Sequence, residues 1–391
     1  MRRLTEEREA LVAKIRKVEG FEDFLQGASF AKLRQVASEG PVIMVNHSEF
    51  RCDALVLLQC EDRPCVCVPL DSAWFSDSLE LCNELLRARY KDRVHSLEYD
   101  ETLRRAMKIT WDRVASKVIR CLEEYGVAKG SRIWWCPTLF LSTLPFHAAG
   151  PYEDANGCKK YLIDDYISSY TPTLASLIAA RANVRLGSDK FLFVGDTSLK
   201  STRNELNRIR NRRRVGRCLL DDKTTRDAVL RALRKAEWAH FACHGQLDWQ
   251  KPFESSLALP GGKLTLLDIA RTRIPNAEFA FLSACHTAEQ RPAFSLDEAL
   301  HLAAAMQFCG FRSVVGTMWE FLDRDGPILA DAVYSYLMDD TEEGEVRFKR
   351  AAAAVRKASL YLRESHKSWG DRGEEVEIMA ERWVNLIHIG A

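Results

Sequence analysis

The chain has 391 residues, with an apolar fraction of 47% and a charged fraction of 28%, which is ordinary for a globular protein with one or two cores. Its 56 Lys and Arg residues nearly balance its 55 Asp and Glu residues, so net charge points to neither nucleic acid nor membrane. The first 20 residues mix both charges, and prolines interrupt the longest uncharged stretch, 133–150, so we expect the first to be no signal peptide and the second no membrane span.

The twelve cysteines form no Cys-x-x-Cys pair, and no Cys/His spacing fits a zinc site. We therefore expect no metal ion and no cofactor. Most of these cysteines stand in apolar runs such as "PCVCVPL", and a chain of this size does not need disulfides to be stable. We interpret nearly all of them as reduced, buried thiols in a cytoplasmic protein.

The first half of the chain mixes helical spacing with short β-type runs. Helices are expected from Leu4 to about Gly20, over 52–60, 73–125 (mostly) and 174–183, and strands over 41–46, 65–70, 132–137 and 139–146.

From residue 190 onward, apolar strands and helices alternate. Strands are expected over 190–196, 237–245, 277–285, 311–319 and 383–390, and helices over 224–236, 265–274, 295–310, 327–338 and 346–363. "GGK" at 261–263 is interpreted as a hairpin turn. Uninterrupted apolar strands separated by helices predict an α/β fold whose mostly parallel sheet is covered on both faces. The Gly, Ser and Asp residues at 187–189 are the clearest boundary, dividing 1–186 from 187–391.

Two of the predicted strands end on reactive side chains. "HFACHG" places His244 and Gly245 after one strand, and "FAFLSAC" places Cys285 after another. Because functional sites of parallel sheets lie beyond the carboxyl ends of the strands, the two side chains are candidates for one site. An imidazole favours the nucleophilic thiolate of a neighbouring cysteine, and the backbone N–H groups of Gly245 and Cys285 suit an oxyanion hole. The alternative interpretation is two side chains that only cap their strands.

Several motifs in a fixed order resemble the CHAT domain, a member of the caspase-like cysteine peptidases that is related to separase. They are "LPFHAAG", "YTPTLASLIAAR", "HFACHG", "ESSLAL", "LTLLDIA", "LSACHTA" and "SLDEALHLAAAMQFCGFRSVVGTMW". The resemblance covers roughly residues 130–391, and the opening segment is similar to the N-terminal part of fungal CHAT proteins.

The resemblance implies a caspase-like peptidase core over 187–391, with His244 as the base and Cys285 as the nucleophile. It also implies that 1–186 is an α/β half that is a degenerate, non-catalytic or regulatory copy of the same architecture. Neighbouring residues along a strand point to opposite faces, so Cys243 is expected to pack in the core. Cys309 is also assigned to the core, His286 receives no chemical role, and His47 is interpreted as structural.

Substrate-binding residues are expected on both sides of the nucleophile. Ser283 stands where relatives that cleave after Arg or Lys commonly have an acid, so it does not encode a basic P1 residue. The segment 319–325 is the other expected wall, with Trp319 and Phe321 offering apolar surface and Asp323 offering charge. An inward Asp323 would restore a basic preference. We expect an apolar or uncharged P1 residue.

The sequence leaves three function classes open. The first is a cysteine endopeptidase that acts on a protein or peptide substrate. The second is a catalytically silent caspase-like interaction module, and the third is a regulatory half that an activating protein partner switches on. The seven arginines in 203–217 suit an acidic partner better than nucleic acid, because no aromatic residues lie among them.

Overall fold

The structure is a computed structural model. It describes residues 2–19, 21, 24–91, 94–182, 190–246, 248, 251–272, 274, 276–284, 302–320, 322–339, 346–365, 368–369, 375–376 and 378–391. Three residues singled out from the sequence, Cys285, His286 and Phe321, lie outside the described residues.

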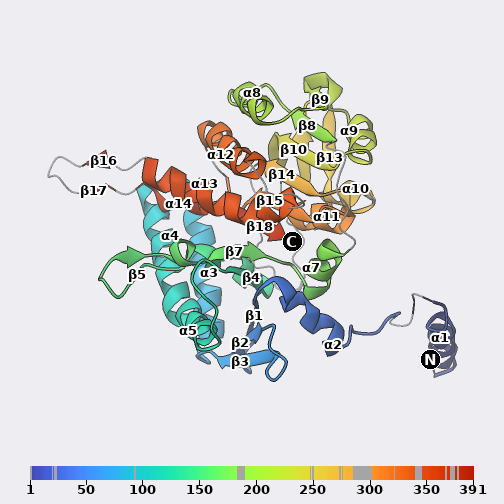
Figure 1. Cartoon of the computed structure of the whole chain (residues 1–391). Helices are drawn as coiled ribbons and strands as arrows, with labels where there is room; N and C mark the ends of the chain where they lie inside the picture. Colours follow the sequence, from blue (N-terminus) through green and yellow to red (C-terminus); the bar gives the residue numbers. More distant parts are fainter. Residues whose placement is uncertain are drawn as a thin grey trace.

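Among the described residues, eleven strands form one sheet that extends through the body of the molecule (Figure 1). In spatial order they are β3 (Cys65–Pro69), β2 (Cys52–Leu57), β1 (Val42–His47), β4 (Arg132–Pro137), β7 (Ile167–Tyr170), β18 (Leu386–Gly390), β15 (Ser313–Thr317), β14 (Phe279–Ser283), β10 (Trp238–Ala242), β8 (Phe191–Gly195) and β9 (Arg217–Leu220). Neighbours are parallel except at β3–β2, β2–β1 and β18–β15. The predicted mostly parallel α/β sheet is confirmed.

Helices cover both faces of this sheet, whereas α1 lies apart from it (Figure 1). The helices are α1 (Arg2–Ile15), α2 (Phe30–Leu33), α3 (Trp74–Lys91), α4 (Leu97–Thr110), α5 (Ser116–Glu124), α6 (Leu162–Asp165), α7 (Leu174–Arg181), α8 (Thr202–Arg212), α9 (Arg226–Leu233), α10 (Leu266–Ala270), α11 (Leu302–Cys309), α12 (Gly326–Met338), α13 (Ala351–Ser365) and α14 (Ala380–Val384). A π-helical turn, Trp111–Ala115, joins α4 to α5. On one face α12 packs between α8 and α13, and on the other α11 packs with α7 and α10.

Burial explains why apolar and polar residues do not alternate along the central strands. Every residue of β8, β10, β14, β15 and β18 is buried, as expected for strands covered on both faces. The outermost strand β3 instead alternates between exposed and half-buried residues. Its Cys65 and Cys67 are exposed, so the expectation of buried thiols is wrong for "PCVCVPL".

Two predicted elements of the first half differ in the structure. Residues 52–57 form strand β2 rather than a helix, because a tight turn returns the chain antiparallel to β1. In that turn the Ser48 N–H donates to the Arg51 carbonyl at 3.0 Å, and the Arg51 N–H donates to Ser48 Oγ at 3.1 Å. Residues 139–146 form 3-10 turns, Leu139–Thr143 and Phe146–Ala148, rather than a strand. Strands β1 and β7 already pair with both edges of β4, and Pro145 has no N–H to donate to a ladder.

The antiparallel step between β18 and β15 reverses the direction of the sheet. Strands β1, β4 and β7 run parallel to β18, whereas β14, β10 and β8 run parallel to β15. The carboxyl end of β1, with His47, therefore lies at the sheet edge opposite to the carboxyl ends of β10 and β14. The sheet continues across the two halves of the chain, and a domain division after residue 186 remains a prediction.

Candidate functional site

His244 lies where β10 leaves the main sheet. The strand is buried to Ala242, and Cys243 is 2% exposed, which confirms its expected place in the core. The chain then forms β11 (His244–Gln246), which pairs antiparallel with β12 (Ser256–Leu259) and, through it, with β13 (Gly262–Thr265). This pairing places His244 opposite Ala258 and confirms the hairpin turn around Gly261. The His244 imidazole is exposed, so it is accessible to a substrate.

The neighbouring strand β14 ends beside β10 in parallel register. Ala242 pairs with Ser283, the last residue of each strand. The next residue of β14, Ala284, is 1% exposed, and its carbonyl accepts a hydrogen bond from Thr317 Oγ1 at 2.6 Å. Thr317 is the last residue of β15, so three adjacent strand ends are fixed to one another. Hydrogen bonds therefore fix the backbone of this strand as far as Ala284, the residue before Cys285.

The residues expected to bind substrate lie in different surroundings. Ser283 is buried at the end of β14. Trp319 is fully buried, with its ring against Tyr99 of α4 and its Nε1–H donating to the Glu381 carbonyl at 3.2 Å. Asp323 is exposed, and its carboxylate accepts a hydrogen bond from the Ser201 N–H at 3.0 Å. Gly245 is half-buried within β11. Their roles toward a substrate remain predictions.

Sequence reasoning missed a buried polar group on β10, the strand that leads to His244. His240 of β10 contacts Glu205 Oε1 at 3.0 Å and Tyr334 Oη at 3.1 Å. Its ring stacks on those of Phe193 and Phe281. These contacts join β10 to α8 and α12, because Glu205 and Tyr334 lie on those helices. The sequence signal was a single His in an apolar strand, which does not reveal distant partners.

The arginine-rich segment is partly used within the fold. Arg208 and Arg212 of α8 pair with Asp331 of α12. Arg213 is 8% exposed, with its guanidinium 4.1 Å from the centre of the Trp238 ring. These three arginines therefore act mainly in attaching α8 to its neighbours, which leaves less charge for an acidic partner.

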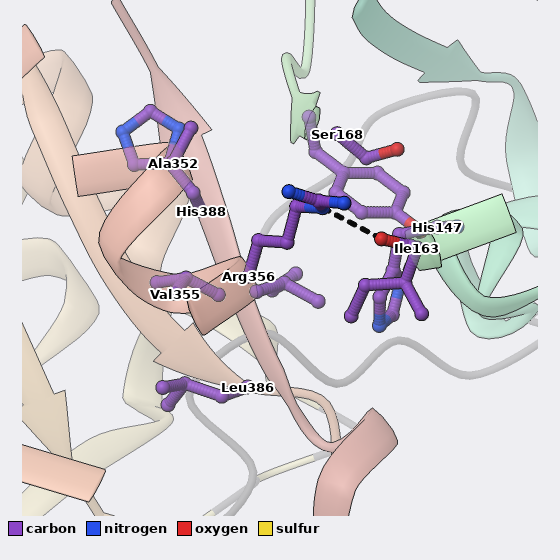
Figure 2. A pocket seen from close by; sticks show the side chains of 10 residues that line it. His147, Ile163, Ser168, Ala352, Val355, Arg356, Leu386 and His388 are labelled. Atoms are coloured by element: carbon purple, nitrogen blue, oxygen red, sulfur yellow. Dashed lines mark hydrogen bonds between the residues drawn. The ribbon is translucent and has the colours of Figure 1, made fainter. Parts of the chain in front are cut away.

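A small cavity lies between α13 and the strands β7 and β18 (Figure 2). Its volume of about 10 Å³ suits a single water molecule. Figure 2 shows Arg356 reaching past it, with Nε donating to the Ile163 carbonyl at 2.7 Å. His147 of the "LPFHAAG" motif lines the cavity and bonds Tyr170 Oη and the Val384 carbonyl, each at 2.8 Å. The cavity is too small for a peptide side chain.

Within the described ranges, no group of three or more His, Cys, Asp or Glu side chains is placed to hold a metal ion. No helix of the described chain is both long and apolar enough to cross a membrane.

His47 is 2% exposed and packs edge-on against Phe140, which fits the structural role expected of it. Burial lowers the pKa of His47 to about 4. Burial likewise raises the pKa of the core thiol Cys309 to about 12.

Solved structures with this arrangement define its class. Two crystal structures of the Saccharomyces cerevisiae separase–securin complex match with TM-scores of 0.56 and 0.52, each at 10% identity over 92% of this chain. The Arg-specific cysteine proteinase gingipain R matches with a TM-score of 0.45 at 11% identity, over 81% of this chain and 74% of its own. The chain spans only 30% of the length of the two matched chains from the separase–securin structures. The fold is the caspase-like α/β fold.

The family follows from the sequence match. The profile of the CHAT domain matches residues 100–391, and the chain belongs to the CHAT domain family. The match begins before the proposed boundary at residue 187 and includes β4 and β7 of the first half. A search of curated proteins finds no match to the sequence.

Proposed function

We propose that this protein is a caspase-like cysteine endopeptidase in which His244 is the base and Cys285 the nucleophile. The observation that carries the proposal is the register of β10 and β14. Ala242 pairs with Ser283 at the ends of these two strands, and each candidate residue follows two positions later in the chain. Neighbouring strands lie about 4.8 Å apart, so the chain segments that carry the two candidate residues start side by side at these strand ends.

The chemistry that we propose has two steps. The Cys285 thiolate attacks the scissile carbonyl, and the N–H groups of Gly245 and Cys285 bind the oxyanion that forms. The C–N bond then breaks, and protonated His244 gives its proton to the leaving amine. Water, deprotonated by His244, attacks the thioester, and cleavage of the C–S bond releases the acid and regenerates the thiol. The exposed imidazole of His244 supports this assignment, because a proton carrier must reach the substrate.

We further propose that a protein partner activates the site in the cytoplasm. The structural neighbour from yeast is a separase–securin complex, which supports control by a bound protein. The eleven cysteines of the described chain form no disulfide bonds, which supports a reducing compartment.

The test is labelling of Cys285 with a thiol-directed peptide probe, with and without cell lysate, in the wild type and in Cys285→Ala. The expected result is labelling at Cys285 in at least one condition, together with peptide hydrolysis that the Cys285→Ala variant lacks. Equal hydrolysis by the two proteins would refute the nucleophile. A folded wild type that neither labels nor hydrolyses in either condition would favour the silent interaction module.

A further inference from the structure

The loop after β15 crosses the edge of the sheet that carries the candidate site. We call residues 318–325, of which 318–320 and 322–325 are described, the crossing loop. It starts at the carboxyl end of β15 and reaches the loop after β8, where Asp323 accepts the Ser201 N–H. Strands β14 and β10 lie between β15 and β8 in the sheet. It therefore borders the strand ends that lead to His244 and Cys285.

Residues 378–385, which we call the α14 segment, hold both ends of the crossing loop. The side chain of Asn385, 1% exposed, accepts the Trp319 N–H at 3.0 Å and donates to the carbonyls of Trp319 and Glu320 at 3.2 Å. At the far end, Arg382 donates two hydrogen bonds, 2.6 and 2.8 Å long, to the carboxylate of Asp325. Both charged side chains are nearly buried, so this two-bonded pair fixes the position of Asp325 relative to Arg382.

The same segment is held on its other side by the N-terminal helices. The side chain of Glu381 is fully buried. Its carboxylate accepts a hydrogen bond from the backbone N–H of His95 at 2.7 Å and also contacts the His95 imidazole. Asp100 of α4 accepts the Ala380 N–H, and Arg104 donates to the Ile378 carbonyl at 2.8 Å. His95 has φ of +82°, a conformation that costs a non-glycine residue energy and that the contacts with Glu381 help to hold.

We propose that the α14 segment is a positioning element through which helices α3 and α4 set the crossing loop and hence substrate binding. The proposal rests on the proposed peptidase function for its effect on substrate. Glu381 and His95 are positioning residues, because His95 contacts Glu381 and the Glu381 carbonyl accepts the Trp319 Nε1–H at the start of the loop. A partner that shifts the α3–α4 junction would therefore change KM more than the reactivity of Cys285.

The test compares Glu381→Ala and Glu381→Gln with Arg226→Ala as the matched control. Arg226 also binds a carboxylate on another element, Asp268, but it contacts neither the loop nor the α14 segment. In Glu381→Ala we expect the rate of amide hydrogen exchange in the crossing loop to rise by roughly 3- to 30-fold. We expect KM for a peptide substrate to rise by a similar factor. Glutamine can still accept the His95 N–H, so Glu381→Gln should stay near the wild type, as should the control.

A folded Glu381→Ala whose loop exchange matches that of Arg226→Ala would overturn the proposal. Should Glu381→Ala not fold, His95→Ala tests the same contact from the half-exposed side, with the same expected rise. Alkylation of Cys285 by iodoacetamide should proceed at similar rates in all of these proteins. If no protein hydrolyses peptide or labels, the peptidase function fails, while loop exchange still decides whether the segment positions the loop.

Discussion

Ala242 and Ser283 are paired residues at the ends of two neighbouring parallel strands, β10 and β14. The chain continues from one into Cys243 and His244 and from the other into Ala284 and Cys285. Each candidate residue therefore follows two residues after a paired position, with His244 in β11, where the chain has left the main sheet. The pair therefore gives the His-Cys hypothesis a structural register that sequence separation alone does not supply.

Replacing the proposed base should slow the reaction of the thiol. In His244→Ala we expect iodoacetamide labelling of Cys285 at neutral pH to fall and peptide hydrolysis to be lost. The reason is that a cysteine without an imidazole partner ionises near its ordinary pKa of about 8.5. Mass spectrometry of the labelled Cys285 peptide across pH gives the profile. An unchanged profile would show that the two residues are not partners.

Thr317 should affect activity through the backbone beside the nucleophile. Its hydroxyl donates to the Ala284 carbonyl, which belongs to the peptide bond joining Ala284 to Cys285. Thr317→Val leaves a buried acceptor without this donor and should cost about 1–3 kcal/mol in the free energy of unfolding. Hydrolysis should also fall by about tenfold, because small displacements of a reacting group are costly. Urea unfolding and peptide kinetics measure the two effects.

Thr317→Ser is the control for this prediction. The serine hydroxyl can make the same hydrogen bond, so its activity should remain close to that of the wild type. A loss in Thr317→Ser as large as that in Thr317→Val would contradict the prediction, because serine keeps the hydroxyl that donates to Ala284.

The sequence predicts the strands of the second half well because they are buried on both faces. Their apolar runs need no knowledge of the partner strand, as β8, β10 and β14 show. The first half is harder to predict. An apolar run such as 52–57 suits a helix or a strand, and only the turn at 48–51 and pairing with β1 decide between them.

The candidate site shows the same limit. His244 is visible in sequence because a strand ends there, whereas Asn385 stands inside the stretch predicted as the last strand and has no local signature. Its role depends on the carbonyls of Trp319 and Glu320, about 65 residues away in the chain. The buried pair of Arg382 and Asp325 is equally distant and equally invisible to spacing arguments.

His147 should make the fold sensitive to acid. Burial lowers its pKa to about 4, below the ordinary value of 6.5, so the folded protein holds the ring neutral. The neutral ring contributes to the free energy of unfolding above pH 6.5. This contribution, about 3 kcal/mol in total, is lost as the pH falls toward 4. Glutamine can still donate to the Val384 carbonyl and accept from Tyr170. Urea unfolding of His147→Gln should therefore depend less on pH between 6.5 and 4 than that of the wild type.

Parallel stability curves for the two proteins over that range would contradict this prediction. His388 is a second source of acid sensitivity, because burial lowers its pKa as well. The comparison of His147→Gln with the wild type removes that contribution, since His388 is common to both proteins.

The last prediction concerns the residue that precedes the cleaved bond. Ser283 carries no charge, and Trp319 is fully buried against Tyr99, so neither presents a carboxylate to a substrate. Asp323 is exposed, but its carboxylate accepts the Ser201 N–H, which holds it toward the loop after β8.

We therefore expect cleavage mainly after apolar or uncharged residues, measured with a peptide library. Asparagine at 323 can still accept the Ser201 N–H, so Asp323→Asn removes the charge while keeping the contact, and it should leave the cleavage preference unchanged. Predominant cleavage after Arg or Lys that Asp323→Asn abolishes would instead assign Asp323 to the P1 pocket.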